Sequence, residues 1–255
     1  MRVGILAAVC LLAACANSRH YPAGTLALDH FWIATATGGA AERAALEQAG
    51  FRISPTVNRH DGQGTASQTV EFENGFLELL YPDPSVPVTS EGGRIAQQRF
   101  TERANWRENN VSPFGIAVRR TPATPAEFPF ETWRVTSDWM APGTFMEMLT
   151  PRGSRAVNVA VHAHGTDEGA NLRTIASGGE AAWQFQHPNG ARRITNLVVI
   201  APDIDGLPPS AQFVNDSGAV SMRAGNEWLA VLTLDNGAQG QRRDLRPALP
   251  LVVHY

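Results

Sequence analysis

The order of local patterns between residues 26 and 84 is the feature that most constrains how this chain can fold. Stretches rich in β-branched and aromatic residues predict strands, and an alanine- and leucine-rich stretch between Thr37 and Gly50 predicts one helix. The predicted elements are a strand at Leu26–Thr35, a helix at Thr37–Ala49, and strands at Phe51–Val57, Ser67–Phe72 and Phe76–Tyr81. The last two strands are joined by a turn signal, Glu73-Asn74-Gly75. This β-α-β-β-β order predicts an α+β fold.

A second segment, at about 112–151, repeats part of this order. Its predicted strands are Phe114–Arg119, Thr132–Ser137 and Thr144–Leu149. It ends on the letters F-M-E-M-L, which match the F-L-E-L-L at the end of the first unit. The helix of the first unit has no counterpart here, because Thr121–Pro129 is too rich in proline to be helical.

A third segment, at about 190–237, repeats the order again. It predicts a strand at Ile194–Ala201, a short helix at Pro209–Phe213, and a hairpin of Ala219–Arg223 with Trp228–Leu234. A strand at Val157–His164, a short helix at Glu168–Ala176 and a final strand at Ala248–Tyr255 complete the prediction. We therefore expect one domain over residues 26–255, built from paired or tripled β-α-β-β-β units.

The N-terminus has the pattern of a targeting segment. Arg2 precedes an apolar run, Val3–Ala14, that is too short to span a bilayer but fits a signal peptide. Leu12-Ala13-Ala14-Cys15 resembles the cleavage box of bacterial lipoproteins. That resemblance implies a signal peptide at 1–14, an acylated Cys15, a tether at 15–25, and an outer-membrane location facing the periplasm. The alternative is an ordinary signal peptide in which Cys15 is incidental.

Composition excludes several function classes. The formal net charge of −3 argues against nucleic-acid binding. No lysine is present, so Schiff-base chemistry is excluded. Both cysteines, Cys10 and Cys15, precede the folded body, which therefore has no disulfide, cysteine metal site or catalytic thiol.

Several short segments together resemble the glyoxalase-like domain of the vicinal oxygen chelate superfamily. They are Leu28-Asp29-His30, Gly64-Thr65-Ala66, Phe76–Leu80, Ser112-Pro113-Phe114 and His187–Ala191. The resemblance covers residues 26–237. It implies repeated units that form curved, mostly antiparallel sheets around a cleft, in which many members hold a divalent metal.

The same resemblance implies a set of metal ligands. His30 falls on the first-strand ligand position, and Glu78 and Glu147 fall on the last-strand positions of the first two units. The remaining position holds Pro113 or Phe114, which cannot ligate a metal. One imidazole and two carboxylates resemble the triad that binds Fe(II), Mn or Zn. Glu78 and Glu147 are then also the candidates for moving a proton during catalysis.

Other pairings and roles stay open. If the third unit is the partner of the first, its positions are Asn196 and Ala230, and only His30 and Glu78 remain as strong ligands. His30 can equally be a core histidine that is hydrogen-bonded to Glu78. His162 and His164 form an H-x-H pair on a predicted strand, either a metal pair or an exposed edge.

Arg59 and His187 are the candidates for substrate binding. Arg59 opens a glycine-rich polar loop, and His187 precedes a turn that it could otherwise simply order. The overall expectation is a lipid-anchored, metal-dependent lyase, isomerase or dioxygenase for a small oxygenated substrate. The alternative is a metal-free binding or non-catalytic envelope protein on the same scaffold. Proteins with this paired-unit scaffold often dimerise, so the resemblance also makes a homodimer possible.

Overall fold

The computed structural model describes residues 22–162, 175, 178–202 and 208–255. The expected signal peptide, Cys15, His164 and almost all of the expected helix at 168–176 lie outside the described residues. Two sheets organise the rest. One has eight strands in the order β2-β3-β4-β1-β5-β8-β7-β6, and the other has five in the order β10-β9-β11-β13-β12. Most neighbouring strands of the large sheet are antiparallel, so the expected α+β class is confirmed.

The first unit forms one half of the large sheet. It consists of β1 (Leu26–Ala34), α1 (Ala40–Gln48), β2 (Asn58–His60), β3 (Thr65–Phe72) and β4 (Gly75–Pro82). The second strand is shorter and later than predicted. Residues 51–57 are not a strand, because Pro55 lacks a backbone N–H and Phe51 is buried in the core rather than in a ladder.

The second unit forms the other half of the large sheet. It consists of β5 (Phe114–Arg120), β6 (Trp133–Val135), β7 (Met146–Met148) and β8 (Asn158–His162). Strand β8 pairs in parallel with β5 just as β4 pairs in parallel with β1. The last strand of this unit is therefore β8. The prediction that Glu147 lies on the last strand of the second unit is wrong, because Glu147 is on β7.

Two helices between the units were not predicted. Helix α2 (Glu91–Ala104) is capped by the Ser90 side chain, and the single-turn α3 (Trp106–Asn109) follows it. Helix α2 packs beside β4 and β1, where Phe100 meets the Trp32 ring edge to face at 5.4 Å between centroids. Its Gly92-Gly93 start disfavours a helix, but the Ala, Gln, Arg and Glu residues that follow are good helix formers, so the Ser90 cap and packing on the sheet establish this helix.

The third segment builds the smaller sheet with a different topology. It consists of β9 (Ile194–Ala201), α5 (Pro209–Asp216), β10 (Ser221–Ala224), β11 (Leu229–Leu234), β12 (Arg242–Asp244) and β13 (Leu251–His254), with short 3-10 helices at Ala182–Phe185 and Asp235–Gly237. The predicted hairpin of β10 with β11 is wrong. Helix α5 connects the end of β9 to the start of β10, so the two strands run in parallel and pair with each other. Strand β11 pairs with β9 on its opposite edge, so β10 and β11 are not neighbours. This segment is therefore not a third β-α-β-β-β unit.

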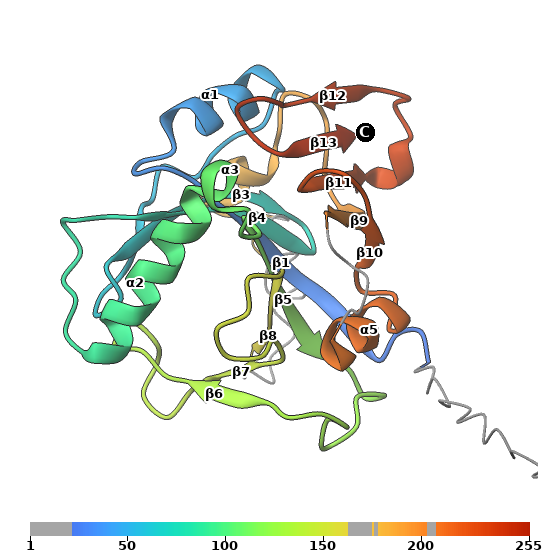
Figure 1. Ribbon diagram of the computed structural model, residues 1–255. Coiled ribbons are helices and arrows are strands. Elements are labelled where there is room, and N and C mark those ends of the chain that lie inside the picture. The colour runs from blue at the N-terminus through green and yellow to red at the C-terminus, as the bar shows by residue number, and fades with distance from the viewer. Residues whose placement is uncertain (1–21, 163–174, 176–177, 203–207) are drawn as a thin grey trace, which may run out of the picture.

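One hydrophobic core joins the two sheets. Phe31 and Ile33 of the large sheet belong to the same buried cluster as Leu197 and Val199 of the small one. Figure 1 shows the small sheet and α5 on one side of β1 and β5, with α2 on the other. The large sheet therefore has one face in the core and one face toward α2.

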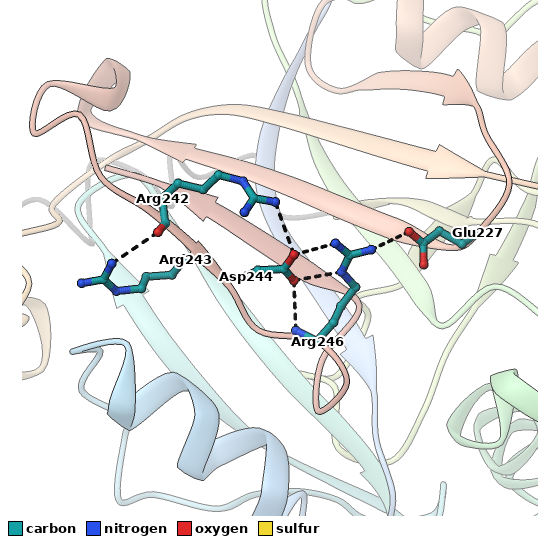
Figure 2. A network of polar contacts seen from close by, with 5 residues as sticks. All are labelled: Glu227, Arg242, Arg243, Asp244 and Arg246. Carbon is teal, nitrogen blue, oxygen red and sulfur yellow. Dashed lines mark hydrogen bonds and ion pairs between the residues drawn. The ribbon is translucent and has the colours of Figure 1, made fainter.

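An ion-pair network lies along β12, the edge strand of the small sheet. Asp244 of β12 accepts hydrogen bonds from Arg246 and pairs with Arg242, and Arg246 continues to Glu227 (Figure 2). Hydrogen bonding from Arg246 holds the pKa of Asp244 well below its usual range. The network links β12 to the turn before β11.

No helix among the described residues is long and apolar enough to cross a membrane.

Candidate metal centre

One row of residues, paired in register, crosses the centre of the large sheet. From β4 to β8 this row holds Glu78, Trp32, Gly115 and Asn158. A Cβ on Gly115 would lie 1.9 Å from the Trp32 ring, so the indole covers the backbone of β5. The register thus makes Asn158 the counterpart of Glu78, and Trp32 lies between the two units.

His30 is held by a buried carboxylate. A bulge in β1 between Leu28 and His30 lets Asp29 and His30 face each other, with Asp29 Oδ1 2.6 Å from His30 Nδ1. The other Asp29 oxygen accepts a hydrogen bond from Arg119 at 3.1 Å. Burial opposes ionisation of Asp29, but hydrogen bonding to His30 and the nearby His162 and Arg119 charges lower its pKa to about 2. An ionised Asp29 favours the proton on His30 Nδ1, which leaves the Nε2 lone pair for a ligand.

Glu78 lies between two imidazoles. Its carboxylate oxygens are 3.9 Å from His30 Nε2 and 3.8 Å from His60 Nε2. Both distances are too long for a hydrogen bond. Two ligand atoms that each lie about 2.1 Å from one ion are up to about 4.2 Å apart, so these separations fit an ion between the groups. His30 is 6% exposed and Glu78 is 9% exposed, so both side chains are well shielded.

His162 of β8 completes the group. Its ring meets the His30 ring edge to face at 4.8 Å, while Phe76 stacks on His30 at 4.1 Å. Asp29, His30 and His162 offer ligand atoms that all lie within 4.8 Å of one another. We call Asp29, His30, His60, Glu78 and His162 the histidine cluster. Imidazole and carboxylate are ligands that suit Zn, Fe and Mn, so the donor set fits a divalent metal.

His60 is the member of the cluster whose burial disfavours the charged form. Burial lowers its pKa, and the His30 imidazole lowers it further, against the opposing charges of Glu78 and Asp61. Its Nδ1 lies 2.9 Å from Thr65 Oγ1, and its ring lies 5.0 Å from the Trp139 ring. A neutral imidazole that faces a carboxylate can accept a proton.

The expected ligand Glu147 lies elsewhere. It is on β7 between Met146 and Met148, and its oxygens accept hydrogen bonds from Arg120 and Thr132, each at 2.8 Å. These hydrogen bonds hold Glu147 to Arg120 of β5 and to Thr132 just before β6, whereas the Glu78 carboxylate faces His30 and His60. Its motif resembles that of Glu78, but its strand lies one position farther from the centre of the sheet.

The two expected substrate-binding residues also lie away from the cluster. Arg59 is an exposed side chain of β2 that donates to Ser85. His187 packs against Phe51 and Phe72, accepts a hydrogen bond from Arg52 N–H at 3.0 Å, and lies 2.8 Å from Glu71 O. Both ring nitrogens of His187 are therefore used to order the 186–190 turn.

A cavity of about 670 Å³ lies beside the cluster, under α2. Gln63 and Met146 link the two sites. Both line the cavity, and Gln63 accepts a hydrogen bond from Trp139, the ring against His60, while Met146 pairs in register with His162. His30, Glu78 and His162 do not line the cavity themselves.

The sequence profile of the glyoxalase-like domain matches residues 28–209, which is most of the chain. The chain belongs to this family. A search of curated proteins finds no match for this glyoxalase-like protein. Among solved structures, a hypothetical protein from Staphylococcus aureus is similar, with a TM-score of 0.44 and 7% identity over 89% of this chain and 98% of the other.

Sequence reasoning missed two members of the cluster in this glyoxalase-like protein, Asp29 and His60, and left the third, His162, open as half of an H-x-H metal pair. Asp29 was read only as part of the family-like motif, and His60 only as part of a loop. Alternation along a short strand separates Arg59 from His60 and points them to opposite faces, which is the signal that could have found His60. His162 was noticed in the H-x-H pair, but its strand was not recognised as the last of the second unit.

Proposed function

We propose that this glyoxalase-like protein holds a divalent ion with His30, Glu78 and His162 and acts on a small oxygenated molecule. The observation that carries the proposal is the 3.9 Å separation of His30 Nε2 and Glu78 Oε2, with both side chains buried and His162 against the same imidazole. Fe, Mn and Zn suit these donors. The resemblance to the superfamily implies the reaction classes lyase, isomerase and dioxygenase.

Each residue of the cluster has a separate task. A bound ion supplies charge stabilisation to oxygens that develop negative charge. Asp29 orients the His30 ring through Nδ1. His60 Nε2, 3.8 Å from Glu78 Oε1, accepts or returns a proton, because its lowered pKa keeps it neutral near pH 7.

Metal content tests the proposal. The protein is incubated with Fe(II), Mn(II) or Zn(II), desalted and analysed by elemental mass spectrometry. We expect near-stoichiometric metal in the wild type and in Glu147→Gln, and loss of metal in His30→Gln and Glu78→Gln. Glu147→Gln is the matched control because it removes an equivalent strand carboxylate outside the cluster. No metal in the wild type under any of these conditions would contradict the proposal.

A metal-free binding protein is the second candidate. Two observations support this candidate. The Trp32 ring fills the space above Gly115 at the centre of the sheet, and the cavity is not lined by His30, Glu78 or His162, so a ligand in it would not contact the proposed metal ligands. A ligand that raises the melting temperature of chelator-treated protein, together with absent metal, would favour this function.

We also propose that the protein is lipid-anchored in the bacterial envelope through Cys15. The support is the apolar run and the Leu12-Ala13-Ala14-Cys15 box. Wild-type protein should incorporate labelled palmitate and sediment with membranes, and Cys15→Ser should do neither. Labelling of both proteins, or of neither, would contradict this anchor.

A further inference from the structure

We propose that the cavity under α2 is a binding site for an organic anion with an aromatic or apolar body. Its walls come from α2 on one side and from β6, β7 and the 150–155 loop on the other. The lining contains five arginines and two carboxylates, Glu102 and Asp138. We call it the arginine cavity. The arginines are Arg99, Arg103, Arg134, Arg152 and Arg155.

Arg103 is the main reason for this assignment. It is only 7% exposed, and its guanidinium donates to three carbonyl oxygens, those of Ser112, Ala156 and Ser154. No carboxylate forms an ion pair with it in the part of the chain that the structure describes. The nearby Glu102 carboxylate favours the charged guanidinium, but burial and the Arg99 charge outweigh it and lower the pKa of Arg103 to about 10. A buried cation with so little compensation is costly, and carbonyl dipoles offset that cost only in part. An anion in the cavity would supply the missing charge.

Three exposed arginines add further positive charge to the lining. Arg152 stacks on Trp133 at 4.0 Å, and Arg134 lies over Phe145 at 4.1 Å. Arg99 reaches across from α2 toward Gly153. Among the described residues none of these three guanidiniums pairs with a carboxylate. Guanidinium groups bind carboxylate, phosphate and sulfonate through paired N–H donors, so the shared chemistry of the ligand is an oxyanion.

The rest of the lining indicates the body of the ligand. Trp133, Met146, Met148 and Phe100 present apolar surface between the charges. Ile95 is 40% exposed, although it also lines the cavity. A volume of about 670 Å³ suits a ligand of one or two rings. This inference does not rest on the metal, because His30, Glu78 and His162 are not part of the lining.

The test compares two fluorescent probes of nearly the same shape. 8-Anilinonaphthalene-1-sulfonate carries a sulfonate, and N-phenyl-1-naphthylamine is the same ring system without it. Both are titrated into the full chain after chelator treatment, which removes any dependence on metal. We expect the sulfonate probe to bind at least tenfold more tightly than the neutral probe.

The variants locate the binding. Arg99→Gln/Arg152→Gln removes two exposed guanidiniums of the lining and should weaken the sulfonate probe at least tenfold while leaving the neutral probe unchanged. Arg94→Gln is the matched control, since Arg94 is on the same helix but pairs with Glu91 outside the cavity. Equal affinity for both probes, or equal weakening in Arg94→Gln and in the double variant, would overturn the proposal. Displacement of the sulfonate probe by benzoate or by phenyl phosphate then separates carboxylate from phosphate ligands.

Discussion

At the scale of single residues, Asp29 determines how His30 is presented. It bonds His30 with one oxygen and Arg119 with the other, and it is almost fully buried. We expect Asp29→Asn to lower the free energy of unfolding by about 3 kcal/mol, because Arg119 loses its buried counter-charge. Chemical denaturation of chelator-treated protein measures this loss.

The same variant separates an orienting residue from a ligand. Removal of a group that only orients a ligating histidine weakens metal binding about 10- to 100-fold. We therefore expect Asp29→Asn to weaken binding within this range and Glu78→Gln to weaken it further. If Asp29→Asn abolished binding while Glu78→Gln left it intact, Asp29 would be the ligand and Glu78 would not.

His187 is the second residue whose role the contacts define. Its ring nitrogens serve the Arg52 N–H and the Glu71 carbonyl, and its ring packs against Phe51 and Phe72. We expect His187→Ala to destabilise the fold by about 2–3 kcal/mol, because two backbone groups lose their partner and a cavity opens. Metal content and sulfonate-probe affinity should stay at wild-type values. A stable variant with lost ligand binding would instead make His187 a substrate-binding residue.

At the scale of elements, the seam between β1 and β5 depends on one glycine. A Cβ at Gly115 would overlap the Trp32 ring, which leaves no room for even a methyl group. We expect Gly115→Ala to destabilise the protein by about 1–3 kcal/mol through overpacking and to change the tryptophan emission spectrum. The cost should shrink in a Trp32→Ala background, where the methyl group meets no ring. An unchanged cost in that background would show that the ring is not the obstacle.

The edge strand β12 gives a pH-dependent prediction. Asp244 has a lowered pKa in the folded protein, so its contribution is present above the ordinary aspartate value and is lost as pH falls through the folded value. The pair network is at the surface, so we expect Asp244→Asn to cost only about 0.5–1 kcal/mol at pH 7. The stability difference from wild type should disappear in strong acid and shrink in high salt. A difference that persisted at low pH would assign it to something other than the charge.

At the scale of the whole molecule, the two sheets should unfold together. Phe128 and Phe130 come from the segment that replaces the missing helix of the second unit, and both pack edge to face on Phe213 of α5. The buried cluster that contains Phe213 extends through both sheets. We expect a single thermal transition, and Phe213→Ala should lower stability by about 3–5 kcal/mol without splitting it. Two separate transitions would show that the sheets are independent units.

Local patterns predicted much of this fold. Strands β1, β3, β4, β5, β9 and β13 lie close to their predicted positions, because their sequences are rich in β-branched, aromatic and other apolar residues. The repeated order of elements led to the α+β class and to the family, which the profile match confirms. The sequence also placed His30 and Glu78 on neighbouring strands, because both residues lie within the family-like segments. Their role as metal ligands stays a prediction.

Tertiary structure alone decided which segments meet. Glu147 and Glu78 have the same local motif, yet only the pairing of β8 with β5 shows that Asn158, and not Glu147, occupies the matching row. His60 and His162 join His30 from other strands of the sheet, and α2 is helical although two glycines lie in its first turn. The physical reason is that alternation and propensity act over a few residues. Strand partners, helix packing and buried charges depend on contacts between distant segments, and the sequence records those contacts only through the fold they stabilise.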